Sequence, residues 1–256
     1  MKKLFFAALS LLFLLPPPAG AELITKDTRW SGVVNLADDV LVCKGATLTI
    51  AAGTKVLFEE ATSTKTDPSF WSPNTEIAVN GRLVVEGTKE EPVTFEPVTG
   101  VGGGIIAATG SEVVIKGARI ARSEEGLLAA GGSMAVSDTE ITGCDTGIVI
   151  NRGAEFKAEK VKVSSCKVGG ADMRNYNKNT LPPDYGKNGE KAEFPEFTYT
   201  GFDGVTFSGC ADAIALYFNE QRFIYEEKRP AGPKTSDDPK GRVREFLGDY
   251  TVDGRE

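Results

Sequence analysis

Short apolar runs recur at a nearly constant interval in the middle of the chain. Each run begins at a glycine, and these glycines are spaced 22, 21 and 22 residues apart: Gly104, Gly126, Gly147 and Gly169. A similar run at 213–216 begins 44 residues after Gly169, which is twice the interval. A repeat of this length is typical of solenoid folds, in which each repeat is one supersecondary unit stacked on the next.

Two further apolar columns follow these runs within the repeat. One contains pairs of residues two positions apart: Leu48/Ile50, Leu83/Val85, Val113/Ile115, Met134/Val136 and Phe156/Ala158. The other contains pairs with the same spacing: Val56/Phe58, Val93/Phe95, Ala118/Ile120, Thr139/Ile141, Val161/Val163 and Val205/Phe207. Because successive side chains of a strand point to opposite faces, this spacing predicts strands with one buried face.

Three strands in about 22 residues leave no room for a crossover helix between parallel strands. We therefore expect the chain to wind so that each strand pairs with its counterpart one coil later. A β-sandwich would need longer strands with hairpin turns, and a leucine-rich repeat would need a regular leucine and asparagine consensus. The sequence predicts an all-β fold: a right-handed parallel β-helix, or solenoid, with three short strands per coil.

Segments 45–58, 81–88 and 92–95 read GATLTIAAGTKVLF, GRLVVEGT and PVTF. They resemble the coils of bacterial exported right-handed parallel β-helix repeat proteins of the pectate-lyase-like superfamily. The resemblance covers about residues 30–217 and implies the fold. It does not imply one activity, because the superfamily includes polysaccharide lyases, polygalacturonases and pectin methylesterases as well as many non-enzymes.

The N-terminus has the features of an export signal. Lys2 and Lys3 precede the apolar run 4–15, and Ala19 and Ala21 give a small-residue cleavage pattern, so we predict a signal peptide at 1–21. We expect no integral membrane segment after its removal, because no later apolar run is long enough. The predicted location is the bacterial periplasm or the exterior. The β-helix is predicted at 22–222, with insertions near 59–75 and 175–197, and a charged C-terminal tail or cap at 223–256.

Charge and composition restrict the function further. The chain has a net charge of −7 and contains no histidine. Loss of Lys2 and Lys3 with the signal peptide gives −7 − 2 = −9, so nucleic acid is not an expected partner. The absence of histidine excludes every mechanism that needs an imidazole, including that of the polygalacturonases, which the resemblance associates with a Gly-His-Gly motif.

Three cysteines share one position in the repeat. Cys144, Cys166 and Cys210 each follow the last apolar residue of the third column by three positions, so we expect them to stack at one corner of successive coils. Neighbours would then lie about 5 Å apart, near the Cα separation of a disulfide. The column is either a ladder of free thiols or contains one disulfide, Cys144–Cys166 or Cys166–Cys210. Its linear form argues against a tetrahedral metal site, and Cys43 is expected to be unpaired.

The two insertions are candidate binding loops, because loops of solenoids carry function more often than coils do. The first contains Phe70 and Trp71, which either stack on a sugar or fold back on the coil. The second begins near Tyr176 and contains Tyr185. Its residues either form one wall of a ligand groove or belong to a solvated loop.

Carboxylates provide the remaining candidates. Asp172, Arg174 and Asp212 lie beside the second insertion and could bind a sugar or Ca²⁺, or the two aspartates simply form turns. Acids on the outer faces of the middle coils could serve a lyase: Asp138, Glu140, Asp145, Glu155 and Glu159. Basic residues alternate with these acids, as on the outer face of any soluble sheet.

The sequence therefore favours a non-catalytic exported protein, which binds a glycan or another envelope component or forms a surface scaffold. The alternative is a carbohydrate-active enzyme, a polysaccharide lyase or hydrolase, that uses acids on one sheet face. No cofactor is expected, except Ca²⁺ under the lyase alternative. A groove lined by two or three acids and an arginine, beside 175–195, would favour the enzyme. A flat face of mixed charge would argue against it.

Overall fold

The computed structural model describes residues 21–61, 69–151, 153–176, 202, 204–218, 221–226 and 242–245. These residues form strands β1 to β23. Tyr185, most of the predicted signal peptide and most of the two predicted insertions and tail lie outside the described residues. The described part of the chain contains no helix that could span a membrane.

The strands form three sheets, and consecutive strands of a coil belong to different sheets. The first sheet contains β1 (Glu22–Ile24), β4 (Val40–Val42), β7 (Glu76–Val79), β10 (Gly104–Ala107), β13 (Glu125–Ala129), β16 (Thr146–Asn151), β19 (Gly169–Tyr176), β21 (Ile214–Phe218), β22 (Gln221–Glu226) and β23 (Arg242–Glu245). The second sheet contains β2 (Thr28–Trp30), β5 (Thr47–Ala51), β8 (Arg82–Glu86), β11 (Glu112–Lys116), β14 (Ser133–Ser137) and β17 (Glu155–Glu159). The third sheet contains β3 (Val33–Leu36), β6 (Lys55–Phe58), β9 (Val93–Pro97), β12 (Ala118–Ala121), β15 (Glu140–Thr142), β18 (Val161–Ser164) and β20 (Val205–Ser208).

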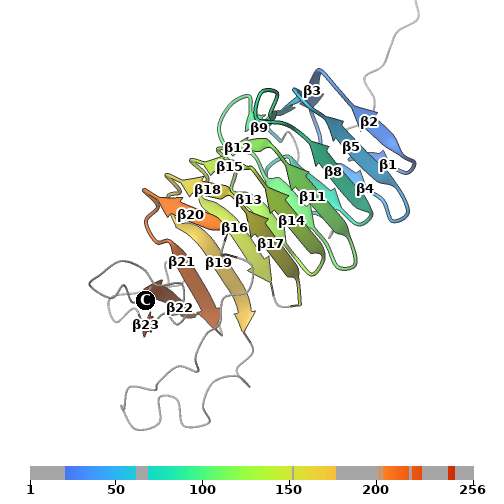
Figure 1. The fold of residues 1–256 in the computed structure, drawn as a ribbon. Coiled ribbons are helices and arrows are strands. Elements are labelled where there is room, and N and C mark those ends of the chain that lie inside the picture. The colour runs from blue at the N-terminus through green and yellow to red at the C-terminus, as the bar shows by residue number, and fades with distance from the viewer. Residues whose placement is uncertain are drawn as a thin grey trace, which may run out of the picture.

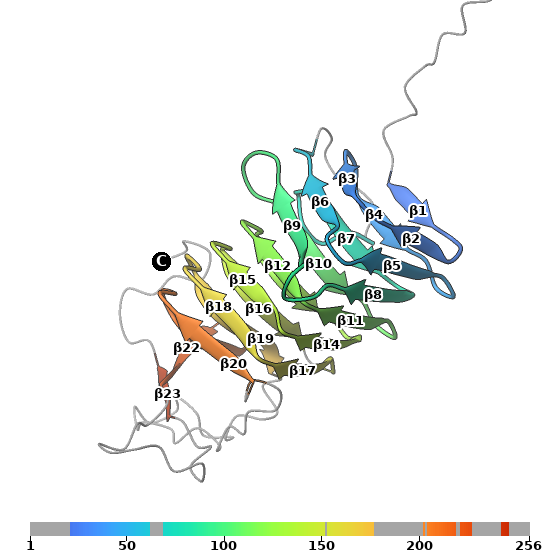
Figure 2. The ribbon, with the colours of Figure 1, turned by 45° about the horizontal axis from the view of Figure 1, so that its top comes forward.

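Pairing between coils is parallel from β1 to β21, and each strand up to β16 pairs with the strand three places further along the chain. The second sheet ends at β17, so β18 pairs with β20. Figures 1 and 2 show the resulting stack of coils, which runs from the N-terminal to the C-terminal end of the described solenoid. The predicted parallel β-helix with three strands per coil is confirmed.

The second-sheet column lies in the register that the sequence predicts. Leu83 is paired with Val113, Val113 with Met134, and Met134 with Phe156. All four side chains are buried in one continuous core. Burial of successive inward side chains against one another is the main stabilising contribution in such a stack.

The third-sheet column departs from the expected alignment at one step. The sequence pattern aligns Val56 and Phe58 with Val93 and Phe95, but the structure pairs Val56 with Phe95 and Phe58 with Pro97. A shift of two residues leaves every inward side chain inward, because the side-chain period of a strand is two. The hydrophobic pattern alone therefore cannot distinguish the two registers.

The first-sheet column also departs by one residue. The sequence pattern aligns Gly147 with Gly169, whereas the structure pairs Ile148 with Ala171 and so places Gly147 level with Gly170. The corner after Cys166 contains one residue more than the corner after Cys144. This longer corner lengthens the coil without changing the face on which each side chain lies.

The strand pairing at the C-terminal end of the solenoid differs from that in its middle. β19 pairs with β21 and β18 with β20, so both sheets continue past the segment 177–201. Phe202 is buried, and its ring lies 5.8 Å from that of Phe156 and 6.2 Å from that of Phe207. Beyond β21, β22 and β23 extend the first sheet in antiparallel fashion. The predicted boundary at residue 222 lies within β22.

Candidate functional site

The outer face of the first sheet is apolar over several coils. Its outward row runs, in register, through Ala78, Ile106, Leu128, Val149, Asp172 and Ala215. All six are at most 3 % exposed, although outward side chains of a solenoid normally face water. Ile106, Leu128 and Val149 form an apolar cluster separate from the core. Asp172 brings a buried carboxylate into this row.

A groove of about 240 Å³ lies over the apolar cluster. Ile106 and Leu128 form its apolar floor. The other lining residues come from five strands of the first sheet and the segments before them: Trp71, Ser72, Glu76, Gly103, Glu124, Glu125, Asn151 and Arg174. We call this feature the first-sheet groove. It crosses the strands, so it follows the axis of the solenoid.

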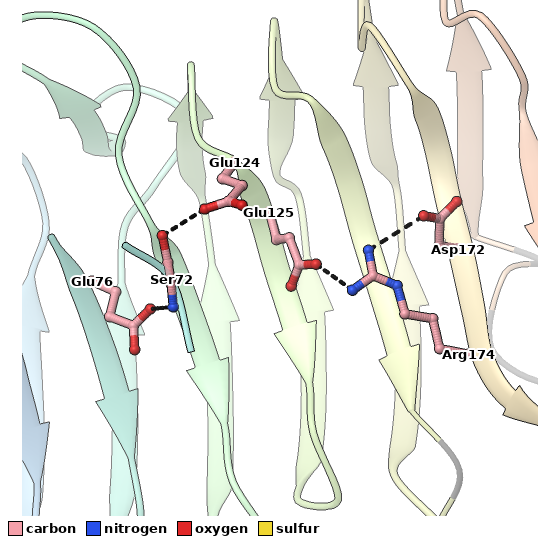
Figure 3. Close-up of polar contacts among 6 residues, drawn as sticks. All are labelled: Ser72, Glu76, Glu124, Glu125, Asp172 and Arg174. Carbon is pink, nitrogen blue, oxygen red and sulfur yellow. Dashed lines mark hydrogen bonds and ion pairs between the residues drawn. The ribbon is translucent and has the colours of Figure 1, made fainter. Parts of the chain in front are cut away.

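One wall of the first-sheet groove is the end of the first insertion. The Glu76 carboxylate accepts hydrogen bonds from the amides of Trp71 (2.7 Å) and Ser72 (2.6 Å). The Ser72 hydroxyl donates to Glu124 at 2.7 Å, and the Asn74 amide group lies 3.5 Å from the same carboxylate oxygen. Figure 3 shows Ser72 held between Glu76 and Glu124. These contacts fix the segment against the sheet and leave Trp71 51 % exposed.

The other end of the first-sheet groove is organised by Arg174 on β19. Its guanidinium forms an ion pair with Glu125 on β13, across the intervening strand β16, and lies 3.5 Å from the Asp172 carboxylate (Figure 3). The Asp172 side chain is 1 % exposed, the Glu125 side chain 20 % and the Arg174 side chain 36 %. Such partly desolvated pairs are stronger than ion pairs on an open surface.

Burial raises the pKa of the Glu125 carboxyl above its ordinary value. Arg174 opposes this increase through its charge and its hydrogen bond, while the charges of Glu124 and Asp172 add to it. Loss of hydration disfavours the ionised carboxylate, as do neighbouring negative charges. Glu125 is therefore the carboxyl group of the groove with a raised affinity for a proton, a property that often marks functional sites.

Asn151 contributes a hydrogen-bond acceptor to the first-sheet groove. It lies at the end of β16 and is in register with Arg174. Its Oδ1 atom is buried and has no hydrogen-bond partner within the part of the chain that the structure describes. A buried polar atom without a partner is costly unless a ligand or water satisfies it.

The structure places the residues predicted to bind ligand at several positions. Trp71 and Arg174 line the first-sheet groove, and Asp172 lies beneath Arg174. Phe70 is partly buried next to Trp71 and does not line the groove. Asp212 lies at the corner before β21, where its carbonyl accepts a hydrogen bond from the Gly170 amide. Asp172 is in register with Ala215, three residues beyond Asp212, so the structure does not bring these two aspartates together on one level.

The two remaining residues of the predicted binding set are tyrosines. Tyr176 belongs to β19, and Tyr185 lies outside the described residues. The sequence prediction missed the carboxylates Glu76, Glu124 and Glu125. The available signal was their position, because each comes directly before or at the start of a first-sheet strand.

The acids that the sequence suggested on the middle coils do not converge on one face. Glu140 belongs to the third sheet, where it pairs with Arg119 and Lys162, whereas Glu159 belongs to the second sheet and pairs with Lys160. Asp145 lies at a corner and pairs with Lys167. Their side chains are well exposed, and such pairs contribute little to stability. This distribution does not fit a lyase site formed by the middle coils.

Among the described residues, no three His, Cys, Asp or Glu side chains come together in a way that could hold a metal ion. The carboxylates of the first-sheet groove have partners within the protein instead. Glu76 accepts from backbone amides, and Glu125 and Asp172 pair with Arg174. The Ca²⁺ site considered for a lyase therefore gains no support from the geometry.

The cysteines Cys144, Cys166 and Cys210 lie at one corner of successive coils, since the strands that precede them, β15, β18 and β20, are neighbours in the third sheet. All four cysteines are free thiols. A hydrogen bond between the Cys144 and Cys166 thiols lowers the pKa of Cys144 and raises that of Cys166. Burial raises the pKa of Cys210. The geometry is thus that of the free-thiol ladder.

This column predicts the order in which the thiols react. Cys43 and Cys210 are partly exposed, whereas Cys144 and Cys166 are buried. Under native conditions, we expect iodoacetamide to modify Cys43 first and Cys210 more slowly, because the thiolate is the nucleophile and burial disfavours it. Cys144 and Cys166 should react only after unfolding. Mass spectrometry of digested peptides over time checks this order. Early modification of Cys144, or a disulfide within the column, would contradict it.

No protein-family model, no curated protein and no solved structure matches the chain. A half-exposed indole, an apolar floor and partly exposed carboxylates suit a ligand that has both apolar faces and hydrogen-bond donors.

Proposed function

We propose that the first-sheet groove binds an extended saccharide and that the protein acts as a glycan-binding module. The observation that carries this proposal is the combination of a half-exposed Trp71 with the polar side chains of Glu124, Glu125, Asn151 and Arg174 in one groove. A sugar ring has an apolar face that can stack on an indole and hydroxyl groups at its edge that bind carboxylates and amides. The lining residues match both properties.

The orientation of the first-sheet groove supports a polymeric ligand. Its residues lie on or beside β7, β10, β13, β16 and β19, which are consecutive neighbours in the sheet. With strands about 4.8 Å apart, four intervals span roughly 19 Å along the solenoid axis. A groove of this length accommodates several units of an extended chain better than a single compact molecule.

The features of residues 1–21 and the resemblance to exported β-helix proteins support a periplasmic or secreted location, where a polysaccharide or another envelope component would be the partner. Export remains part of this proposal. Measuring the N-terminal residue and the compartment of the mature protein tests it separately from ligand binding.

Replacement of Trp71 tests the binding function. We expect Trp71→Ala to weaken binding of the best ligand from a glycan array at least about fivefold, because stacking contacts of a large aromatic side chain contribute about 1–3 kcal/mol. Trp71→Phe keeps a ring and should retain more affinity. Isothermal titration calorimetry measures both variants.

Val98→Ala is the matched control, because Val98 is similarly exposed, at 54 %, but does not line the groove. It should bind like the wild type. Unchanged affinity in Trp71→Ala, or no binding to any glycan of the array by the wild type, would contradict the proposal.

Cleavage of the saccharide is a second candidate function, favoured by the raised pKa of Glu125. Three acids and an arginine line the groove. A groove with this lining is the feature that would favour an enzyme over a binding protein. A carboxyl group with a raised pKa keeps its proton to a higher pH, which favours the role of general acid. However, Glu125 is held by Arg174 and Glu124 by Ser72, which suits a binding role. A depolymerisation assay with the bound glycan, with and without Ca²⁺, decides between them, since product release would establish cleavage.

A further inference from the structure

The first-sheet groove has an excess of negative charge. Glu76, Glu124, Glu125 and Asp172 line it or lie directly beneath it, and Arg174 is the one cationic side chain among its lining residues. Four carboxylates and one guanidinium give a formal charge of −4 + 1 = −3 when all are ionised. The pectate-like polymers associated with the resemblance are themselves polyanions, so they carry the same sign of charge as this groove.

Two donor groups of the first-sheet groove already have partners within the protein. The Ser72 hydroxyl donates to Glu124, and the Arg174 guanidinium binds Glu125 and Asp172. A carboxylate of a ligand would have to take Arg174 from Glu125 and leave that acid without its partner in a partly desolvated place. Breaking such a pair is costly, and the new negative charge would also be repelled by Glu124.

Among the acceptors of the first-sheet groove, in contrast, one has no partner within the described part of the chain and two carboxylates are partly exposed. Asn151 Oδ1 is buried without a hydrogen-bond partner among the described residues. Glu124 and Glu125 are consecutive and both partly exposed, and their negative charges repel each other. A ligand that brings N–H and O–H donors satisfies these atoms, and a protonated amine brings three donors together with a compensating charge.

From this negative charge and these available acceptors, we infer that the saccharide carries free amino groups, which bind at Glu124 and Glu125, and that the groove selects against uronic acids. This inference rests on the proposed saccharide-binding function and specifies the ligand class. Three hexamers of equal length test it with the full-length protein: β-1,4-linked glucosamine, its N-acetylated form and galacturonate. The second hexamer differs from the first by the absence of free amines.

We expect the glucosamine hexamer to bind at least about tenfold more tightly than its N-acetylated form, as a charge-assisted hydrogen bond is stronger than a neutral one. Galacturonate should bind most weakly. Glu125→Gln and Glu124→Gln should each weaken glucosamine binding about tenfold and change binding of the N-acetylated hexamer much less. Glu159→Gln removes the same charge from the exposed face of the second sheet, where its side chain is 72 % exposed, and should have no effect.

The outcomes separate the inference from the proposed function. If galacturonate or the N-acetylated hexamer binds as tightly as glucosamine, and this binding depends on Trp71, the groove binds saccharides but the inferred charge preference is wrong. If glucosamine binding falls equally in Glu159→Gln, the attraction is a general effect of the acidic surface and the inference is also wrong. If none of the three hexamers binds, the inference fails, and the proposed function fails with it only if no glycan of the array binds either.

Discussion

Gly104→Ala is expected to destabilise the protein by about 3 kcal/mol or more. Gly104 begins β10 with a φ of 110°, and a Cβ atom there would lie 1.8 Å from the Glu125 carbonyl oxygen on the neighbouring strand. The variant must therefore adopt a backbone conformation that L-residues avoid and must also displace β13. Because β13 carries Glu125 and Leu128, the same displacement should distort the first-sheet groove. Urea unfolding followed by circular dichroism measures the loss of stability.

Gly110→Ala provides the matched control for this effect. Gly110 also has a positive φ, of 80°, but a Cβ atom at this position would have no heavy atom within 4 Å. Gly110→Ala should therefore lose only the stability that the conformational strain costs, about 1–2 kcal/mol. Equal stability losses in the two variants would show that the close approach of β10 and β13 contributes nothing, and this result would contradict the argument.

The coil and its core are predictable from the sequence because they follow from a local pattern. Apolar pairs two positions apart, such as Val113 and Ile115, recur in each repeat, and the constant interval requires each strand to pair with its counterpart. The registers at β6/β9 and β16/β19 are not predictable in this way. One register shift preserves the facing of every side chain, and the other depends on a single extra residue in a corner.

The candidate site could be predicted only in part, because its residues come together through the stacking of coils. Ser72 and Glu124 are 52 positions apart in the chain, and Glu125 and Arg174 are 49 apart. Trp71 and Arg174 were identifiable from their residue types. One further signal was present in the sequence: the first-sheet runs, such as Ile105–Ala107, are continuously apolar. Strands that are buried on both faces have such runs, but second-sheet runs such as Val113–Ile115 are equally apolar, so this pattern alone does not distinguish the first sheet from the other two.

Glu76→Ala is expected to release the wall of the first-sheet groove. The Glu76 carboxylate is fully buried and accepts hydrogen bonds from the Trp71 and Ser72 amides. Its removal leaves both amides without this acceptor, at a cost of about 2–5 kcal/mol. Glu76→Gln keeps one acceptor oxygen at nearly the same place, so it should lose less stability. Saccharide affinity should fall in Glu76→Ala because Trp71 is no longer held in position.

Amide hydrogen exchange separates this local effect from general destabilisation. In the wild type, the amides of Trp71 and Ser72 should exchange slowly because Glu76 accepts from both. In Glu76→Ala they should exchange faster, while the amides of the second-sheet strand β11, far along the chain, remain protected. Glu86→Ala is the control, because Glu86 pairs with Arg29 on an exposed face and should change neither exchange nor affinity. If the Trp71 and Ser72 amides remain protected in Glu76→Ala, the Glu76 carboxylate does not hold this segment on the sheet, and the position of Trp71 must depend on other contacts.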